Sequence, residues 1–167
     1  QEDTSTASSH EVARAEIHRD DKEAGHDDIG RRIYCDGISI VREDEDKITM
    51  RVGSGENWHT FVTYCVDQDY GGIENLSLIP GTVGAAPMQN IGAYGVEVKS
   101  VIDEVEAVEL ASGEIRNFSN ADCHFGYRES IFKNEGKNKY FISSVTLTLT
   151  KRNHQFNTSY GAIKDTL

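Results

Sequence analysis

Apolar and polar residues alternate along two short stretches in the first third of the chain. Residues 38–40 read apolar, polar, apolar, and residues 48–52 place an apolar side chain at every second position. Four consecutive acidic residues, 43–46, separate the two stretches. Alternation with a period of two is typical of half-buried strands, and a polar turn between two such runs predicts a β-hairpin. The second run ends at the turn residues 53–55.

A helical period replaces this alternation in the next segment. Apolar residues recur at positions i, i+3, i+4, i+7 and i+8, which are Trp58, Phe61, Val62, Cys65 and Val66. This spacing predicts an amphipathic helix whose apolar side packs on the core. The glycine pair 71–72 ends the pattern, and residues 73–78 predict one further helical turn.

The second half of the chain again favours strands. Residues 101–110 predict a strand with one wet face, which continues through a turn at 112–113 into a return strand with apolar residues at 115 and 118. Ser119-Asn120 predicts the cap of a short helix that reaches Cys123. Residues 140–150 form the clearest strand, because aliphatic residues and threonines alternate along them. Hairpins with one or two flanking helices predict an α+β fold with a mainly antiparallel sheet, rather than a doubly wound parallel sheet.

Composition and charge narrow the classes of function. The chain has 167 residues, of which 37% are hydrophobic and 27% charged, as in a soluble globular protein of one domain or one domain with a tail. The formal net charge of −11 disfavours a nucleic-acid partner, because a polyanion would be repelled. No apolar run reaches membrane-spanning length, so we expect no membrane partner.

The cysteines and histidines do not suggest a metal site. Cys35, Cys65 and Cys123 are odd in number and widely separated, which indicates reduced thiols in a cytoplasmic protein rather than a disulfide framework or a zinc site. Three histidines recur every eight residues near the start of the chain, but no acidic or cysteine ligand pattern frames them. We therefore expect exposed imidazoles and no bound metal.

These patterns divide the chain into three regions. Residues 1–28 are polar and charge-dense, and they form either a short helix or a disordered leader. Residues 29–150 contain the predicted strands and helices of one α+β domain. Residues 151–167 form a C-terminal segment.

Residues 79–95 fit neither a plain helix nor a plain strand. This segment holds four glycines, three alanines and both prolines of the chain. Glycine lets a ligand approach the backbone closely, and successive amides can form an anion-binding concavity. Composition alone leaves two interpretations open, a loop whose amides face a flat or anionic ligand and a buried turn packed for its own sake. A Gly-x-Gly-x-x-Trp pattern at 53–58 is not a dinucleotide fingerprint, since Trp58 replaces the third glycine.

A second unusual stretch, residues 124–133, concentrates polar chemistry in an acidic chain. It contains Arg128 together with a tyrosine, a serine and a lysine. An arginine presents a planar fork of donors that suits a carboxylate or a phosphate. The alternative for an isolated arginine is a surface salt bridge, here with Glu129 or Glu135.

Four segments taken together resemble one enzyme family. They are 53–58 (Gly-Ser-Gly-Glu-Asn-Trp), 74–81 (Glu-Asn-Leu-Ser-Leu-Ile-Pro-Gly), 87–95 (Pro-Met-Gln-Asn-Ile-Gly-Ala-Tyr-Gly) and 125–133 (Phe-Gly-Tyr-Arg-Glu-Ser-Ile-Phe-Lys). These segments closely resemble the UDP-N-acetylenolpyruvoylglucosamine reductase family, flavoenzymes that complete UDP-N-acetylmuramate in bacterial peptidoglycan synthesis. The resemblance runs from about residue 29 to the end of the chain. Ser159-Tyr160-Gly161 resembles the tyrosine loop of the branch in which a tyrosine closes over the substrate.

The resemblance implies a fold like the second, FAD-contacting domain of that reductase, and it implies the cofactors FAD and NADPH. In the family NADPH reduces FAD, and the flavin passes a hydride to the enolpyruvyl group of a UDP-sugar substrate. The implied FAD contacts are Gly81, Thr82, Val83, Gly84, Ala85, Ala86, Gln89, Asn90, Ile91 and Gly92. Arg128 is the implied catalytic residue and faces the substrate carboxylate. The implied substrate contacts are Tyr94, Tyr127, Arg128 and Tyr160.

Departures from the family qualify this expectation. Family members are considerably longer, with a separate glycine-rich flavin lobe before this region and a third lobe after it that supplies the proton-donating serine. We therefore expect this chain to be the central portion and incomplete for catalysis, with weak or no FAD binding and no turnover by itself. Ala85 and Ala86 stand where some members carry serines, so hydroxyl contacts to the flavin are lost there. The alternative is a non-catalytic fragment or interaction module that keeps the fold, or a chain that self-associates through bare strand edges. The oligomeric state is not predicted.

Overall fold

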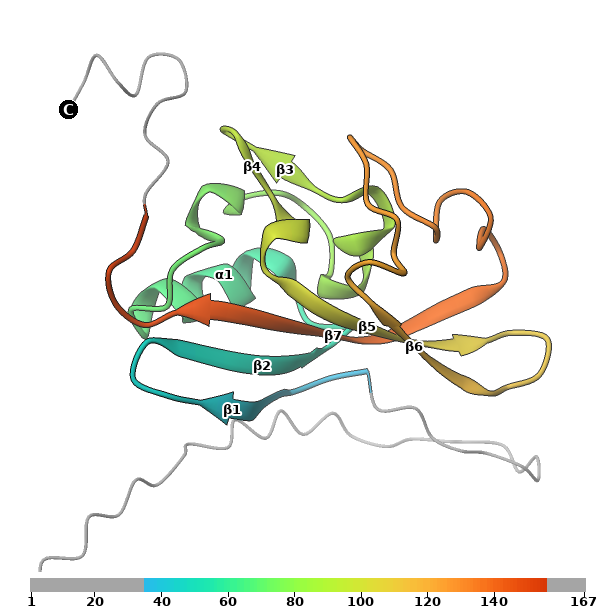
Figure 1. The fold of residues 1–167 in the computed structure, drawn as a ribbon, viewed down its shortest axis with the longest axis horizontal. Helices are drawn as coiled ribbons and strands as arrows, with labels where there is room; N and C mark the ends of the chain where they lie inside the picture. The colour runs from blue at the N-terminus through green and yellow to red at the C-terminus, as the bar shows by residue number, and fades with distance from the viewer. Residues whose placement is uncertain (1–34, 156–167) are drawn as a thin grey trace, which may run out of the picture. The chain divides into compact units, whose positions relative to one another are not determined.

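Residues 35–155 are described by a computed structural model of the chain (Figure 1). The predicted leader 1–28, its boundary with the domain at residue 29, and Tyr160 lie outside this range, so those predictions stay predictions. Among the described residues, no helix is long and apolar enough to cross a membrane.

A five-stranded antiparallel sheet forms the centre of the fold, with strand order β1-β2-β7-β5-β6. The strands are β1 (Ile38–Glu43), β2 (Lys47–Gly53), β5 (Ile102–Glu109), β6 (Ile115–Ser119) and β7 (Tyr140–Thr150). The longest strand, β7, lies in the middle of the sheet and pairs with both β2 and β5. The predicted antiparallel α+β class, both predicted hairpins and the strand at 140–150 are therefore confirmed.

The two faces of the sheet differ as the alternation predicts. Ile48 pairs with Leu149 and Met50 pairs with Leu147, and all four side chains are buried. The residues between them point to the opposite face, where the Thr49 and Thr148 hydroxyls lie 2.7 Å apart. The apolar face is the one that α1 and the connecting segments cover (Figure 1).

One α-helix, α1 (Trp58–Asp67), packs on this apolar face. Asn57 caps its N-terminus, because the Asn57 side chain accepts a hydrogen bond from the Thr60 amide at 3.0 Å. The predicted apolar positions are buried except Val66, which is 52% exposed. That part of the prediction is wrong, because Val66 lies at the margin of the apolar stripe, about 80° around the helix axis from Trp58, while Cys65 in the same turn is fully buried.

Short elements make up the rest of the covering layer. They are the 3₁₀ helices η1 (Glu74–Leu76), η2 (Val83–Ala85), η3 (Pro87–Gln89) and η4 (Val98–Ser100), and the two-stranded hairpin of β3 (Gly92–Ala93) and β4 (Val96–Glu97). The predicted helical turn within 73–78 is thus present as η1. The segment predicted to be neither helix nor strand is built from η2, η3 and the hairpin.

The short helix predicted to run from Ser119 to Cys123 is wrong. Ser119 is the last residue of β6, and its hydroxyl and amide bind the Asp122 carboxylate at 2.5 and 3.1 Å. The Cys123 amide donates to the Ser119 carbonyl at 3.1 Å, which closes a single turn. His124 follows with φ of +47°, and this left-handed backbone prevents a second turn.

Candidate functional site

The glycine-rich loop is anchored on the turn that follows β2. The Gly84 amide donates to the Ser54 carbonyl at 3.0 Å, and the Val83 amide donates to the Glu56 carbonyl at 2.9 Å. Gly84 is buried, and a Cβ at this position would lie 2.5 Å from the Ser54 Cβ. The close approach of the two segments therefore requires glycine at 84.

The start of the same loop offers two backbone donors to solvent. Gly81 and Thr82 are exposed, and within residues 35–155 neither amide N–H donates to a protein acceptor. Gly81 has φ of +127°, a conformation that residues with side chains rarely adopt. Adjacent outward amides of this kind suit an anionic or carbonyl-rich ligand.

The second half of the loop is fixed by a buried asparagine. Asn90 is fully buried and has φ of +44°. Its side-chain nitrogen donates to the Gly126 carbonyl at 2.9 Å, and its side-chain oxygen accepts from the Lys99 amide at 3.1 Å. Asn90 thus joins the loop to the second unusual stretch of the sequence.

Arg128 lies in a tight turn formed by residues 126–129. The Gly126 amide donates to the Glu129 carbonyl at 3.0 Å, and the reverse bond is 3.3 Å long. Arg128 has φ of +56°, in a turn position that glycine or asparagine usually occupies. Backbone strain at a residue of this kind is typical of functional sites.

The arginine turn is held directly against the glycine-rich loop. The Arg128 Nη2 donates to the Gly92 carbonyl at 2.5 Å, and the Ser130 hydroxyl donates to the Met88 carbonyl at 2.6 Å. With the Asn90 bond, these make three side-chain hydrogen bonds between segments about 40 positions apart in sequence. Figure 1 shows the hairpin of β3 and β4 and the connection between β6 and β7 on the same side of the sheet.

The guanidinium of Arg128 keeps donors available after these contacts. The side chain is half-buried and lies 5.7 Å from the centre of the Tyr127 ring. The Lys133 Nζ donates to the Arg128 carbonyl at 2.8 Å, and this bond helps to fix the turn that contains Arg128. The predicted salt bridge of Arg128 with Glu129 or Glu135 is not among the ion pairs of the described residues, and Glu129 instead lies 3.8 Å from Lys133.

The structure brings most predicted site residues together, but some of them are exposed and others are buried. The exposed ones are Gly81, Thr82, Ala85, Gln89, Tyr94 and Tyr127. The buried ones are Val83, Gly84, Ala86, Asn90, Ile91 and Gly92, which serve the packing of the loop. Ser54 and Ser130 were not predicted as parts of the site, and both support it from buried positions. The small residue between two glycines at 53–55 was the available signal for Ser54; no comparable signal pointed to Ser130.

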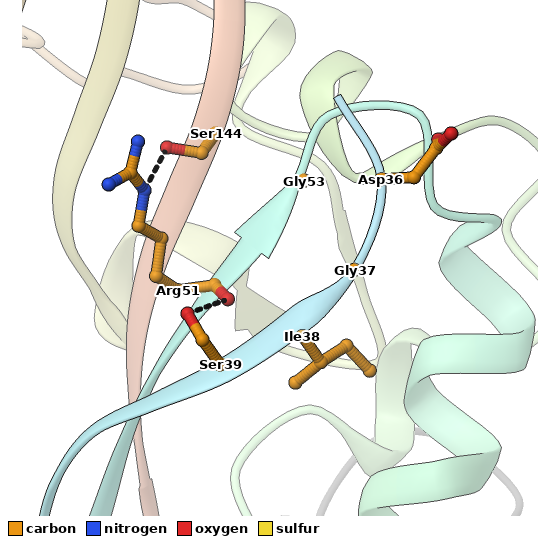
Figure 2. Close-up of a pocket in the computed structure, with 7 residues that line it drawn as sticks. All are labelled: Asp36, Gly37, Ile38, Ser39, Arg51, Gly53 and Ser144. Carbon is orange, nitrogen blue, oxygen red and sulfur yellow. Dashed lines mark hydrogen bonds between the residues drawn. The ribbon is translucent and has the colours of Figure 1, made fainter. Parts of the chain in front are cut away.

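A shallow pocket of about 260 Å³ lies beside the Gly53 turn, on the side of β1. Its lining residues are Asp36, Gly37, Ile38, Ser39, Arg51, Gly53 and Ser144 (Figure 2). The Arg51 Nε donates to the Ser144 hydroxyl at 2.9 Å, and Arg51 also pairs with Glu106 at 2.6 Å. None of the predicted site residues lines this pocket.

The described residues include two buried cysteines and side chains of the types that can hold a metal ion. Burial raises the pKa of the Cys65 and Cys123 thiols to about 12, so both are protonated near neutral pH. Among residues 35–155, no three His, Cys, Asp or Glu side chains are grouped so that they could hold a metal ion.

Comparisons with known proteins show the family of the chain. The family described as "FAD binding domain" matches residues 34–119. A UDP-N-acetylenolpyruvoylglucosamine reductase from Flavobacterium johnsoniae is 52% identical over 127 residues, which cover 76% of this chain and 38% of that protein. The protein of the same name from Amoebophilus asiaticus is 53% identical over 131 residues, or 78% of this chain and 38% of that protein. The chain thus spans about 38% of the length of these curated relatives.

A solved structure shows the same likeness. The crystal structure of UDP-N-acetylenolpyruvylglucosamine reductase from Thermus caldophilus matches with a TM-score of 0.54 and 27% sequence identity. The match covers 61% of this chain and 36% of the Thermus chain.

Proposed function

Because the chain belongs to the FAD binding domain family and is similar to UDP-N-acetylenolpyruvoylglucosamine reductases, we propose that it forms the flavin- and substrate-contacting part of such a reductase. The proposed reaction is the reduction of UDP-N-acetylglucosamine enolpyruvate to UDP-N-acetylmuramate in the cytoplasm, with NADPH as the reductant. The proposal keeps the predicted domain division, with residues 29–150 as the flavin-contacting domain and 151–167 as the segment that carries Tyr160.

The observation that supports this proposal most strongly is the docking of the arginine turn on the glycine-rich loop. Three side-chain hydrogen bonds hold Arg128 beside backbone that is suited to a cofactor. A flavin bound at the loop would therefore lie next to the one arginine that the resemblance assigns to the substrate carboxylate.

The exposed amides of Gly81 and Thr82 suit the first task of the site, which is to hold the flavin. These groups donate to phosphate or carbonyl oxygen without carrying charge, so an acidic chain can still bind an anionic cofactor. The buried residues Val83 and Gly84 that follow them keep the loop backbone fixed, which reduces the entropy that binding must overcome.

Arg128 suits the second task. Bound FAD, once reduced by NADPH, would supply the hydride for the enolpyruvyl double bond, and the third lobe of the reductase would supply the proton that completes the reduction. Negative charge then increases on the neighbouring carbon and its carboxylate, and the guanidinium stabilises that charge because it is already oriented by the Gly92 carbonyl. Tyr94 and Tyr127 are exposed beside it and are the proposed substrate contacts, together with Tyr160.

Serine substitutions at two adjacent alanines test the flavin contact. Ala85 is exposed whereas Ala86 is 1% exposed and belongs to the core. Ala85→Ser is expected to strengthen FAD binding roughly fivefold, the effect of about one added hydrogen bond. Ala86→Ser is expected to lower the free energy of unfolding by about 1–3 kcal/mol, because it buries a hydroxyl. Flavin fluorescence titration and urea unfolding measure the two effects.

Ala85→Glu provides the opposite change at the exposed position. A carboxylate beside the cofactor phosphates is expected to weaken FAD binding at least tenfold without changing the free energy of unfolding. If a folded Ala85→Glu variant bound FAD as the parent does, the proposed contact would be excluded. A folded reductase that carries this segment and does not bind FAD at millimolar concentration would instead favour a non-catalytic module.

A further inference from the structure

The first turn of α1 holds the backbone that leads into the glycine-rich loop. The Trp58 ring Nε1 donates to the Leu76 carbonyl at 2.8 Å, and the Trp58 amide donates to the Gly81 carbonyl at 3.0 Å. His59, the next residue, contacts the segment between these points. Its Nδ1 lies 3.0 Å from the Ser77 hydroxyl and 3.4 Å from the Leu78 amide nitrogen.

The Leu78 contact defines the protonation of the His59 ring. A backbone N–H can only donate, so the His59 Nδ1 must accept with a lone pair. The ring is then neutral, with its proton on Nε2, and the Ser77 hydroxyl donates to the same Nδ1. A proton on Nδ1 would face the Leu78 N–H and abolish that bond, whereas the Ser77 hydroxyl could still accept a hydrogen bond from Nδ1.

The segment that His59 holds is strained. Leu78 has φ of +63°, which is unusual for a residue with a side chain, and its side chain is 77% exposed. Such a conformation persists only when neighbouring contacts fix it. Leu78 lies three residues before Gly81, so a change in its backbone would redirect the exposed amides of Gly81 and Thr82.

Other ionisable groups near this junction are engaged elsewhere. The Glu56 carboxylate, just before α1, accepts from the Gly37 amide at 2.7 Å, and the Glu74 carboxylate on η1 accepts from the Gly72 amide at 2.6 Å. Tyr64 and Asp67 lie farther along α1. On β4, which contacts η1, Glu97 pairs with Lys99 at 2.7 Å.

We propose that His59 is a positioning residue for the flavin-contacting loop. As a neutral acceptor it fixes Ser77 and Leu78, and a proton on Nδ1 releases the Leu78 amide and weakens flavin binding. The His59 clamp, which consists of the contacts of His59 with Ser77 and Leu78, is present in the ligand-free chain. Only the effect of this clamp on flavin binding rests on the proposed function.

Trp58 provides a direct readout, because it is the single tryptophan of the chain and adjoins His59. In the ligand-free protein, its emission is expected to change in one transition as the pH is lowered from 8 to 5, because a proton on Nδ1 would break the Leu78 bond. His59→Asn places a non-titrating acceptor near the position of Nδ1 and is expected to remove the transition while keeping the pH 8 spectrum. His59→Ala is expected to show the low-pH spectrum at both pH values. The control His124→Asn changes an exposed histidine elsewhere and is expected to leave the transition intact.

Flavin titrations at pH 8 and pH 5.5 test the consequence for binding. FAD affinity of the parent is expected to fall at least fivefold on acidification, and that of His59→Asn is expected to change less than twofold. A Trp58 transition that persists in His59→Asn would overturn the clamp. The Trp58 transition could behave as expected while the parent and His59→Asn lose FAD affinity equally on acidification. That result would overturn the link between the clamp and the loop amides. Absence of FAD binding at both pH values, in the isolated chain and in a reductase that carries this segment, would contradict the proposed function and this link, while the Trp58 spectra would still decide the clamp.

Discussion

Replacing Arg128 with methionine is expected to lower turnover by about 100-fold, as the loss of a preorganised electrostatic contact does in other enzymes. The change removes the cation that we propose faces the substrate carboxylate and keeps a side chain of similar length. FAD affinity is expected to change little, because the proposed flavin contacts are the loop amides rather than the guanidinium. Substrate-dependent oxidation of NADPH by a reductase that carries this segment measures the first effect, and flavin titration measures the second.

Two further variants make this prediction specific. Arg116→Met removes the same charge from an arginine on β6 that is 50% exposed and pairs with Glu109 at 3.3 Å, so its turnover is expected to match the parent. Arg128→Gly loses the bond to Gly92 but also relieves the positive φ, so its free energy of unfolding is expected to stay within about 1 kcal/mol of the parent. Turnover of Arg128→Met within threefold of Arg116→Met would show that Arg128 has no role in the reaction.

Gly84→Ala is expected to lower the free energy of unfolding by about 2–3 kcal/mol and to abolish FAD binding. The new Cβ would lie 2.5 Å from the Ser54 Cβ and 3.1 Å from the Ser54 carbonyl oxygen. Neither neighbour can move easily, because the Ser54 amide donates to the Ser143 carbonyl of β7. The loop would therefore separate from the turn, and the exposed amides would lose their orientation.

Gly113→Ala is the matched control for this substitution. Gly113 lies in the turn between β5 and β6, where an added Cβ meets nothing within 4 Å, although its φ is +72°. Its expected effect is a loss of about 1 kcal/mol from backbone strain, with FAD binding unchanged. Urea unfolding and flavin titration of both variants separate steric conflict in the loop from a general cost of replacing glycine. A Gly84→Ala variant as stable as the parent would contradict the described contact.

The strands were predictable because one physical rule dominates them. Along β7 and β2, one face is buried and the other is polar, so the side-chain period of two is visible in the sequence itself. The error at Val66 arose because helical spacing alone does not reveal where the margin of the buried stripe falls. The error at residues 119–123 arose because Ser119 and Asp122 cap one turn, but the left-handed backbone of His124 ends it before a helix forms.

The site was predictable in its segments but not in its contacts. Glycine content and family resemblance identified the two loops, yet nothing in the sequence reveals that Ser130 binds the Met88 carbonyl. Asn90 illustrates the limit most clearly. The resemblance implies a cofactor contact there, whereas in this chain both ends of its amide bind the protein interior, so its side chain joins the two loops.

Backbone amide NMR with stepwise addition of FAD tests the central claim most directly, because chemical shifts report even weak binding at individual residues. We predict that the Gly81 and Thr82 amides shift most, followed by their neighbours up to Ala85, and that Arg128→Met leaves this pattern unchanged. Saturable binding that leaves Gly81 and Thr82 unshifted, and that instead shifts amides of the pocket at Gly37 to Ser39, would contradict the account.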